Sequence, residues 1–322
     1  MAKFRMGRMR LAGLRLLTLA VTISGGTALA TRPAAAQTAV TSAESEWLQD
    51  LDTWRARRAQ EVDAPDGWLT LVGLEWLKPG TNSVGAASDN RIQVHANVPD
   101  HIGLLTVSGK TLQLLSPSGG FPADLKIDGQ AAREGPLASD AKSALISWHG
   151  LSMVVLNRGG RYAVRIKDAD SATRAGFHGL NWYAPDPQFS VEARWVPFTP
   201  PHVERIPTGI GTTLDLPAPG TAEFMVAGHK LTLEPVLESP GDPTLLFILK
   251  DETGKEATYA GGRYLHAPFP DHGLDKPGKL ILDFNRLENP VCAYTPYASC
   301  PQPTEKNRLP VAIEAGEKRY LP

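Results

Sequence analysis

One stretch, Leu280–Lys318, decides the fold, and it reads LILDFNRLENPVCAYTPYASCPQPTEKNRLPVAIEAGEK. It contains both cysteines of the chain together with many Asn, Arg, Pro and Tyr residues. Alternating apolar residues predict that one strand enters the stretch over Lys279–Phe284 and that another leaves it over Leu309–Ala315. The part between them has little apolar periodicity and is stiffened by prolines. Such a loop is either a structural cap or a binding site, and the residues alone leave both possibilities open.

The two cysteines, Cys292 and Cys300, are predicted to form a disulfide. A metal site would need two more thiolate or imidazole ligands at suitable spacing, and the neighbouring sequence has none. A catalytic thiol would need to stay reduced beside a base. In an exported protein pairing is favoured, because the periplasm and the cell exterior are oxidising. Closing this short loop stabilises a protein by about 2–3 kcal/mol in the loop-entropy model.

Polar residues before and within the loop form the predicted ligand-binding set. Asp283 and Asn285 share one face of a strand by its period of two. Guanidinium groups, amides and the flat rings of Tyr294 and Tyr297 suit sugars, carboxylates and phosphorylated small molecules. The competing interpretation is that these side chains satisfy the backbone of their own loop. The set comprises Arg263, Asp283, Asn285, Arg286 and Asn289.

Catalytic residues are not identified by any motif of the chain. It contains no Gly-x-Ser-x-Gly, His-Glu-x-x-His, phosphate-binding loop or dinucleotide-binding glycine pattern. A hydrolase using Asp283 beside Arg286 is kept as an alternative, although no spacing fixes a second carboxylate. His266 and His272 could bind a metal with Asp271, but histidines in loops are more often solvated, so neither a metal nor another cofactor is predicted.

Residues 1–36 have the pattern of a secretory signal peptide. Five basic residues precede the apolar run Leu16–Ile23, and Ala34–Ala36 ends in the small residues that a signal peptidase accepts. A membrane anchor would need about 20 apolar residues, and Ser24 breaks this run early. The sequence therefore predicts a periplasmic or secreted protein with no membrane span after cleavage.

Cleavage of this leader changes the charge of the chain. Six of the 33 Lys and Arg residues lie in it, which leaves 27 against 34 Asp and Glu. A net charge near −7 disfavours binding to nucleic acid or to an anionic membrane by bulk charge. Nucleic acid is therefore excluded as an expected partner.

The fold class is predicted to be mainly β. Apolar residues at helical spacing, with acidic residues first and arginines later, predict a helix over Ser42–Val62 within residues 37–66. Short β-type runs separated by turn residues then predict a β-sandwich or a partly closed barrel over residues 67–167, and we take the sandwich as the expected fold. Residues 168–188 form a connector, and residues 189–322 form a second β-rich unit that includes the disulfide loop.

Several motifs spread along the chain resemble the bacterial domain-of-unknown-function 1684 family. The motifs are APDGWLTLVGLEWLKPG (Ala64–Gly80), GGRYAVRIKD (Gly159–Asp168), GLNWYAPDP (Gly179–Pro187), YAGGRYL (Tyr259–Leu265) and LDFNRLENPVCAYTPYASCPQPTEKNRLPVAIEAGEK (Leu282–Lys318). The last is long enough to be specific. The family is named for having no assigned function, so the resemblance implies no activity.

A second likeness lies in Gly80–Val94, GTNSVGAASDNRIQV, which looks like the opening of forkhead-associated domains. Those domains are β-sandwiches that bind phosphothreonine peptides, and the resemblance implies such a sandwich here. They follow the second glycine with an arginine that contacts phosphate, whereas Gly85 is followed by Ala86. The likeness thus concerns the fold rather than phosphopeptide binding.

Three functions follow as hypotheses. The leading one is a non-catalytic module of the cell envelope that binds a small molecule or glycan at the predicted set. The second is a hydrolase acting at Asp283 and Arg286. The third is a protein–protein adaptor that uses the N-terminal sandwich, and an exposed aromatic face there would favour it.

Overall fold

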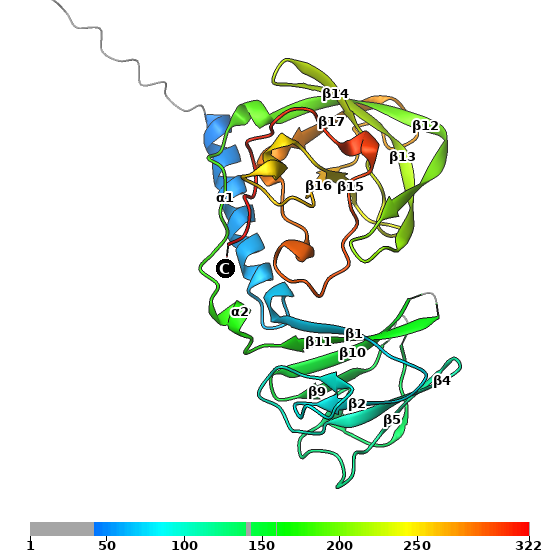
Figure 1. Cartoon of the computed structure of the whole chain (residues 1–322). Coiled ribbons are helices and arrows are strands. Elements are labelled where there is room, and N and C mark those ends of the chain that lie inside the picture. Colours follow the sequence, from blue (N-terminus) through cyan, green and yellow to red (C-terminus); the bar gives the residue numbers. More distant parts are fainter. Residues whose placement is uncertain (1–41, 140–142, 159, 322) are drawn as a thin grey trace, which may run out of the picture. The chain divides into compact units, whose positions relative to one another are not determined.

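The computed structural model describes residues 42–139, 143–158 and 160–321, and the predicted signal peptide lies outside them. The protein is mainly β, as predicted, with one long helix, α1, over Ser42–Val62. This helix begins and ends at the residues that the sequence predicts, and Figure 1 shows it leading towards strand β1. None of the helices in the described ranges is long and apolar enough to cross a membrane.

Two sheets follow α1 in the sequence (Figure 1). One has the strand order β1-β11-β10-β9-β6-β7, and the other has the order β3-β2-β4-β5-β8. Neighbouring strands are antiparallel, except that β2 and β3 are parallel. A short 3-10 helix, η1 (Trp68–Thr70), precedes the first strand. The strands are β1 (Leu71–Trp76), β2 (Gly80–Gly85), β3 (Ile92–Gln93), β4 (Gly103–Ser108), β5 (Thr111–Leu115), β6 (Lys126–Ile127), β7 (Gln130–Ala131), β8 (Gly135–Pro136), β9 (Leu145–Trp148), β10 (Leu151–Arg158) and β11 (Arg161–Asp168).

The rest of the chain forms a four-stranded sheet, β14-β13-β12-β17, and a two-stranded sheet, β15-β16. All of their pairs are antiparallel. The strands are β12 (Ser190–Pro207), β13 (Thr213–Val226), β14 (His229–Leu233), β15 (Thr244–Leu249), β16 (Arg263–Pro268) and β17 (Gly278–Asp283). The helices are α2 (Ala172–Ala175), η2 (Pro187–Phe189), η3 (Glu252–Lys255), η4 (Phe284–Arg286), η5 (Val291–Ala293) and η6 (Glu305–Asn307).

Two large apolar cores explain this arrangement. The first takes buried residues from both N-terminal sheets, such as Val84 on β2 and Val164 on β11, so these two sheets enclose one core. The second gathers Trp195 of β12, Phe247 of β15 and Leu282 of β17, each with no exposed surface. The alternation of buried and exposed residues along the strands supplies these inward faces.

Strand β12 continues through a proline-rich stretch. The apolar runs Val191–Val196 and Val203–Ile206 form one strand, with a register shift between Pro197 and His202. Prolines lack the N–H that a ladder needs, and a bulge lets the strand continue past them. Among the described residues, strand β17 pairs with Ser190–Trp195 and does not reach the prolines.

The predicted strand over Leu309–Ala315 is wrong, because no regular strand forms there. Its alternation is real, since Leu309, Val311 and Ile313 are buried in the second core while the residues between them are exposed. The segment is extended, but an isolated bridge from Arg308 to Lys250 and side-chain bonds hold it in place of a ladder. Period-two patterning reports which face is buried and does not identify the backbone partner.

The predicted disulfide between Cys292 and Cys300 is confirmed, and neither cysteine is free. Cys292 belongs to η5, and Cys300 is buried at the end of the same loop. The bond closes a loop with a sequence separation of 8 residues. The cysteines therefore fix the loop and are not available as metal ligands or nucleophiles.

Replacing both cysteines with alanine should lower the free energy of unfolding by about 2–3 kcal/mol, because the unfolded chain loses its closed loop. Urea unfolding followed by circular dichroism measures the difference. A reducing agent should bring the wild-type protein to the stability of the Cys292→Ala/Cys300→Ala variant and leave the variant unchanged. Equal stability of the oxidised and variant proteins would contradict this role.

Candidate functional site

Arg263, at the start of β16, is buried with 1% of its surface exposed, and its guanidinium is surrounded by oxygen acceptors. It donates to the carbonyl of Ile313 at 2.9 Å and also to the carbonyl of Ala315. The Asp251 carboxylate lies 3.1 Å away and supplies the opposite charge. Burial lowers the pKa of Arg263, and Asp251 opposes that shift. The group is thus occupied by the protein itself.

The glycines that precede Arg263 serve this packing. Gly262 has φ of 99°, and a Cβ there would lie 2.6 Å from the Leu249 carbonyl oxygen and 2.5 Å from Pro303. Only glycine accepts both the left-handed conformation and so close an approach. The motif around Gly262 therefore has a structural explanation in the docking of the C-terminal segment.

Asp283, Asn285 and Arg286 are brought together at the end of β17 and in η4. The Asp283 carboxylate accepts hydrogen bonds from the Asn285 amide at 3.0 Å, from Arg286 Nε at 3.3 Å and from the indole N–H of Trp47 at 3.0 Å. Asn285 has no exposed surface and exchanges two hydrogen bonds of 2.9 Å with the backbone of Asp186. These polar groups connect α1, the connector and the loop.

Asn289 belongs to a second buried cluster. Its side-chain amide donates to Glu317 Oε1 at 2.8 Å, and its backbone N–H donates to Glu317 Oε2 at 3.0 Å. The hydroxyl of Tyr294 donates to the same carboxylate. From α1, Arg58 donates to the Asn289 carbonyl at 2.9 Å and lies 3.4 Å from the Glu288 carboxylate. Burial raises the pKa of Glu317, although Arg58 and the hydrogen bonds oppose the shift.

The predicted ligand-binding residues are thus separated into three internal networks. Asp283 carries four hydrogen bonds, which leaves its carboxylate no free position from which to act as a base. The geometry favours a scaffold role for the whole set. The histidines weighed as metal ligands face different partners, since His266 lies 3.8 Å from Glu288 and His272 lies 3.0 Å from the Pro277 carbonyl.

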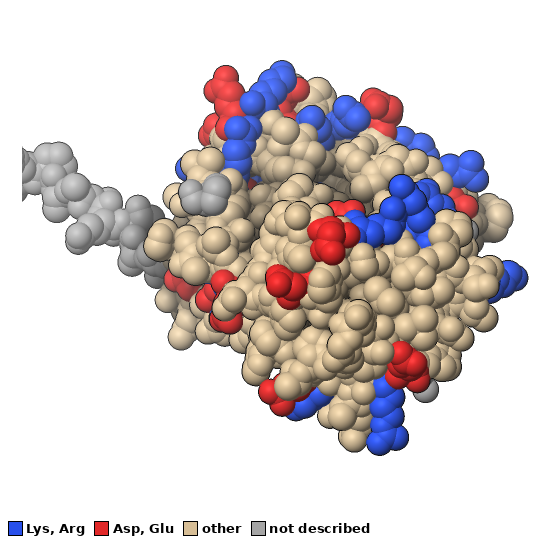
Figure 2. Space-filling view, turned by 60° about the horizontal axis from the view of Figure 1, so that its bottom comes forward, with Lys and Arg blue, Asp and Glu red and all other residues tan. Residues whose placement is uncertain are grey.

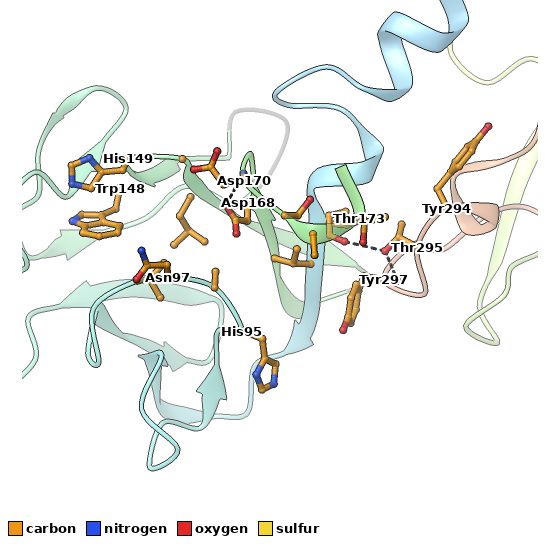
Figure 3. Close-up of a pocket in the computed structure, with 18 of the residues that line it drawn as sticks. His95, Asn97, Trp148, His149, Asp168, Asp170, Thr173, Tyr294, Thr295 and Tyr297 are labelled. Carbon is orange, nitrogen blue, oxygen red and sulfur yellow. Dashed lines mark hydrogen bonds between the residues drawn. The ribbon is translucent and has the colours of Figure 1, made fainter. Parts of the chain in front are cut away.

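A different group of residues lines a cavity of about 650 Å³, where loops of the N-terminal sheets meet the disulfide loop. Figure 3 shows Trp148 and His149 at one end, Thr295 and Tyr297 at the other, and Asp168 and Asp170 between them. We call this cavity the inter-loop cleft. It is lined mainly by Leu71, Val72, His95, Ala96, Asn97, Val98, Trp148, His149, Gly150, Leu151, Asp168, Asp170, Ser171, Ala172, Thr173, Tyr294, Thr295, Pro296 and Tyr297.

The walls of the inter-loop cleft are fixed by hydrogen bonds. The hydroxyl of Thr295 donates to the Leu71 carbonyl at 3.0 Å and thereby attaches the disulfide loop to β1. The indole N–H of Trp148 donates to the Ala123 carbonyl at 2.9 Å. His149 follows in the turn between β9 and β10 with φ of 48°, and its ring contacts that of Trp148 edge-on, with centroids 4.2 Å apart. The cleft is therefore formed before any ligand binds.

Three polar side chains of the cleft face solvent. Within the described ranges, no hydrogen bond or ion pair occupies the side chains of His95, Asn97 or Asp170, and all three are exposed. The Asp168 carboxylate accepts one bond of 2.9 Å from the Asp170 N–H. These groups can exchange water for a ligand without breaking internal bonds, in contrast to the predicted set.

Sequence reasoning identified only the tyrosines of this cleft. The missed residues lie in three turns far apart in sequence, around Asn97, Trp148–Gly150 and Asp168–Asp170. The aromatic-rich turn Trp148–Gly150 was the available signal, because loops at one end of a β scaffold often carry function. Their convergence depends on strand pairing that the sequence does not state.

Comparison with known proteins concerns mainly the C-terminal part of the chain. Residues 175–318 match the family described as "Protein of unknown function (DUF1684)", which supports the predicted family for that part. The chain is 33% identical to an uncharacterized protein of Haloarcula marismortui solved by NMR, with 45% of this chain and 78% of that chain covered and a TM-score of 0.39. No curated protein matches the chain. The likeness to forkhead-associated domains stays a prediction.

Arg263→Met should lower the free energy of unfolding by about 3–5 kcal/mol, because it leaves Asp251 buried without its counter-charge. The matched control is Arg205→Met, since Arg205 pairs with Asp215 at 3.2 Å with side chains 75% and 56% exposed. That change should cost less than about 1 kcal/mol. Urea unfolding compares the variants, and equal losses would show that the Arg263 network is not specially stabilising.

Glu317→Gln should change how stability depends on pH. Below about pH 4.5, the ordinary pKa of this carboxyl, Glu317 is protonated in both folded and unfolded chains. Its folded pKa is raised by burial, so above that pH the unfolded chain releases the proton first and the folded state loses relative stability. The stability of the wild type minus that of Glu317→Gln should therefore fall as pH rises to neutral.

Glu134→Gln supplies a control of opposite sign for this measurement. Hydrogen bonds from Ser116 lower the pKa of Glu134. The stability of the wild type minus that of Glu134→Gln should therefore grow as pH rises. A hydrogen bond lost in the Glu317→Gln variant lowers its free energy of unfolding by the same amount at every pH. Such a loss does not produce the pH dependence that titration of Glu317 produces. A difference for Glu317→Gln that is flat or rises between acidic and neutral pH would contradict the assignment.

Proposed function

We propose that this protein is a non-catalytic binding module of the cell envelope that holds a neutral saccharide or similar polyhydroxylated molecule in the inter-loop cleft. The observation that carries the proposal is the contrast between the two sets of polar residues. His95, Asn97 and Asp170 of the cleft face solvent, whereas Arg263, Asn285 and Asn289 are bound inside the protein. A preformed site avoids the cost of ordering its loops on binding.

The size of the cleft suits a small ligand. Ligand cavities usually have volumes of about 300–1,000 Å³, and this one has about 650 Å³. It combines aromatic surfaces at its two ends with hydrogen-bonding groups between them (Figure 3). Aromatic rings pack on the apolar faces of sugar rings, while carboxylates and amides bind their hydroxyl groups.

Charge narrows the class of ligand. The lining includes the carboxylates of Asp168 and Asp170 and, among the described residues, contains no Lys or Arg. An anionic ligand would meet like charge without a compensating cation, so sugar phosphates and carboxylates are disfavoured. On the face in Figure 2, Lys and Arg side chains lie near Asp and Glu side chains at several places. The net charge near −7 that the chain would have without its leader disfavours nucleic acid as a partner.

The export expected from the sequence agrees with a binding module of the cell envelope. The basic and apolar leader in residues 1–36 is typical of a signal peptide, and the Cys292–Cys300 disulfide suits an oxidising compartment. We therefore place the binding activity in the periplasm or outside the cell.

The other two hypotheses receive less support. A hydrolase would need Asp283 free to act, and its carboxylate has four internal donors. An adaptor would need an exposed apolar face on the N-terminal sheets, and in the described part of residues 67–167 only Leu145 is a largely exposed large apolar side chain, at 43%. Neither has an observation comparable to the inter-loop cleft.

Isothermal titration calorimetry with uncharged oligosaccharides of glucose, xylose and N-acetylglucosamine tests the proposal, with the matching sugar phosphates as anionic probes. At least one neutral probe should bind more tightly than its phosphate. Tyr297→Ala should weaken that binding by about tenfold or more, because it removes a stacking surface. Asp170→Asn should weaken it as well, since the amide is a poorer acceptor for hydroxyl groups.

Asp215→Asn is the matched control, because Asp215 lies on β13 outside the cleft and pairs with the exposed Arg205. It should leave binding unchanged. Absence of heat with every neutral probe at millimolar concentration, or binding that survives Tyr297→Ala and Asp170→Asn together, would overturn the proposal.

A further inference from the structure

Three potential metal ligands converge on the four-stranded sheet, far in sequence from the residues of the inter-loop cleft. His202 and Glu204 lie two apart on β12 and therefore project from the same face. Glu234 directly follows β14. Among the described residues, these three form a group of His, Cys, Asp or Glu whose ligand atoms all lie within 4.8 Å of one another.

The distances between the ligand atoms resemble those around a tetrahedral zinc ion. His202 Nε2 lies 3.2 Å from Glu204 Oε2 and 3.7 Å from Glu234 Oε2. Bonds of about 2.0–2.2 Å at tetrahedral angles place donors about 3.3–3.6 Å apart. The two carboxylate side chains are 17% and 19% exposed and the imidazole is 39% exposed, so the group is partly shielded but reachable from solvent.

Lys306 already places a positive charge beside this group. Its ammonium nitrogen lies 2.9 Å from Glu234 Oε2 and 3.3 Å from Glu204 Oε2. These are the same two oxygens that approach His202. The lysine therefore bonds to the carboxylate atoms that a metal ion would take, while its side chain is 51% exposed and can swing away into solvent.

Surrounding contacts hold the ligands in position. The buried Asn307 accepts a hydrogen bond from the Glu234 N–H at 2.9 Å and donates to the Glu234 carbonyl at 2.9 Å. The ring of Phe198 packs against that of His202 with centroids 4.5 Å apart. Fixed backbone and ring positions of this kind are what orient ligands in metal sites.

We infer that His202, Glu204 and Glu234 form a binding site for a divalent cation of the zinc class and that Lys306 competes with the metal for it. One imidazole with two carboxylates suits Zn²⁺ or Co²⁺, whereas Ca²⁺ and Mg²⁺ prefer oxygen ligands alone. The bound ion links β12 to the residue after β14, and solvent completes its coordination. The site is independent of the inter-loop cleft.

The alternative is an ordinary surface network of ion pairs, and the role of Lys306 separates the two. In such a network the lysine is the only cation, and its removal leaves two repelling carboxylates with no gain of function. In a metal site, removing the lysine vacates the position and increases affinity for the ion. His202 is dispensable in the first case and required in the second.

The test uses protein without a histidine tag, stripped of metal by a chelator and titrated with zinc at neutral pH against a chromophoric competitor. Lys306→Met should bind one zinc per chain at least tenfold more tightly than the wild type. His202→Ala in the Lys306→Met background should abolish that binding. With Co²⁺ as the probe, Lys306→Met should show visible ligand-field bands that the double variant lacks.

Lys279→Met is the matched control, because Lys279 lies 2.7 Å from the single carboxylate of Glu192 in an exposed pair. It should bind zinc no more tightly than the wild type. Lys306→Gln, which removes the charge and retains hydrogen bonding, should follow Lys306→Met, and circular dichroism checks that each variant is folded. Equal zinc affinity of Lys306→Met and wild type, or retention of the zinc after His202→Ala, would overturn the inference.

Discussion

The pairing of the buried Arg263 guanidinium with Asp251 and with the carbonyls of the C-terminal segment is the interaction on which the rest of the C-terminal half depends. A buried charge is costly unless it is paired and hydrogen-bonded, so Arg263 fixes the position of the segment whose carbonyls it binds. Asp251 also accepts a hydrogen bond of 2.7 Å from the Ile313 N–H. These bonds, with the backbone bonds that join Leu309 to Lys250 and Val311 to Glu252, hold an extended segment that belongs to no regular strand.

Glu317 connects the C-terminal segment to α1. Gly316 has φ of 76°, and a Cβ there would lie 2.6 Å from the Leu287 carbonyl oxygen, so glycine lets the chain turn closely against the loop. Glu317 then meets Asn289, and Arg58 of α1 binds the Asn289 carbonyl. Buried polar contacts therefore connect the helix, the loop and the C-terminal segment, which accounts for the Asn289 and Glu317 side chains at this place.

The sequence predicts the secondary structure better than the site for a physical reason. Periodicity reports burial, so the helix Ser42–Val62 and most strands follow from it, and the disulfide follows from compartment and spacing. It fails for Leu309–Ala315, where the buried face is as predicted but side chains replace the ladder. In the sequence, Asp283 and Asn285 have the same polar character whether they bind a ligand or bond to the protein itself. Only their hydrogen-bond partners in the structure distinguish these two roles.

Whether a polar side chain finds its hydrogen-bond partners inside the protein also distinguishes structural residues from candidate binding residues elsewhere in the molecule. A polar side chain that completes its hydrogen bonds inside the protein gains stability but has nothing left to offer a ligand. Asn285 is of this kind, and most of the donors of Arg263 and Asn289 are used in the same way. Asp170 and Asn97, in contrast, remain solvated in the inter-loop cleft. Thr295 shows how the two are coupled, because its bond to the Leu71 carbonyl anchors one end of the cleft to the disulfide loop. The hydrogen-bonded loop thus helps to position the solvated residues of the cleft, and Tyr294 belongs to both, since it lines the cleft and donates to Glu317.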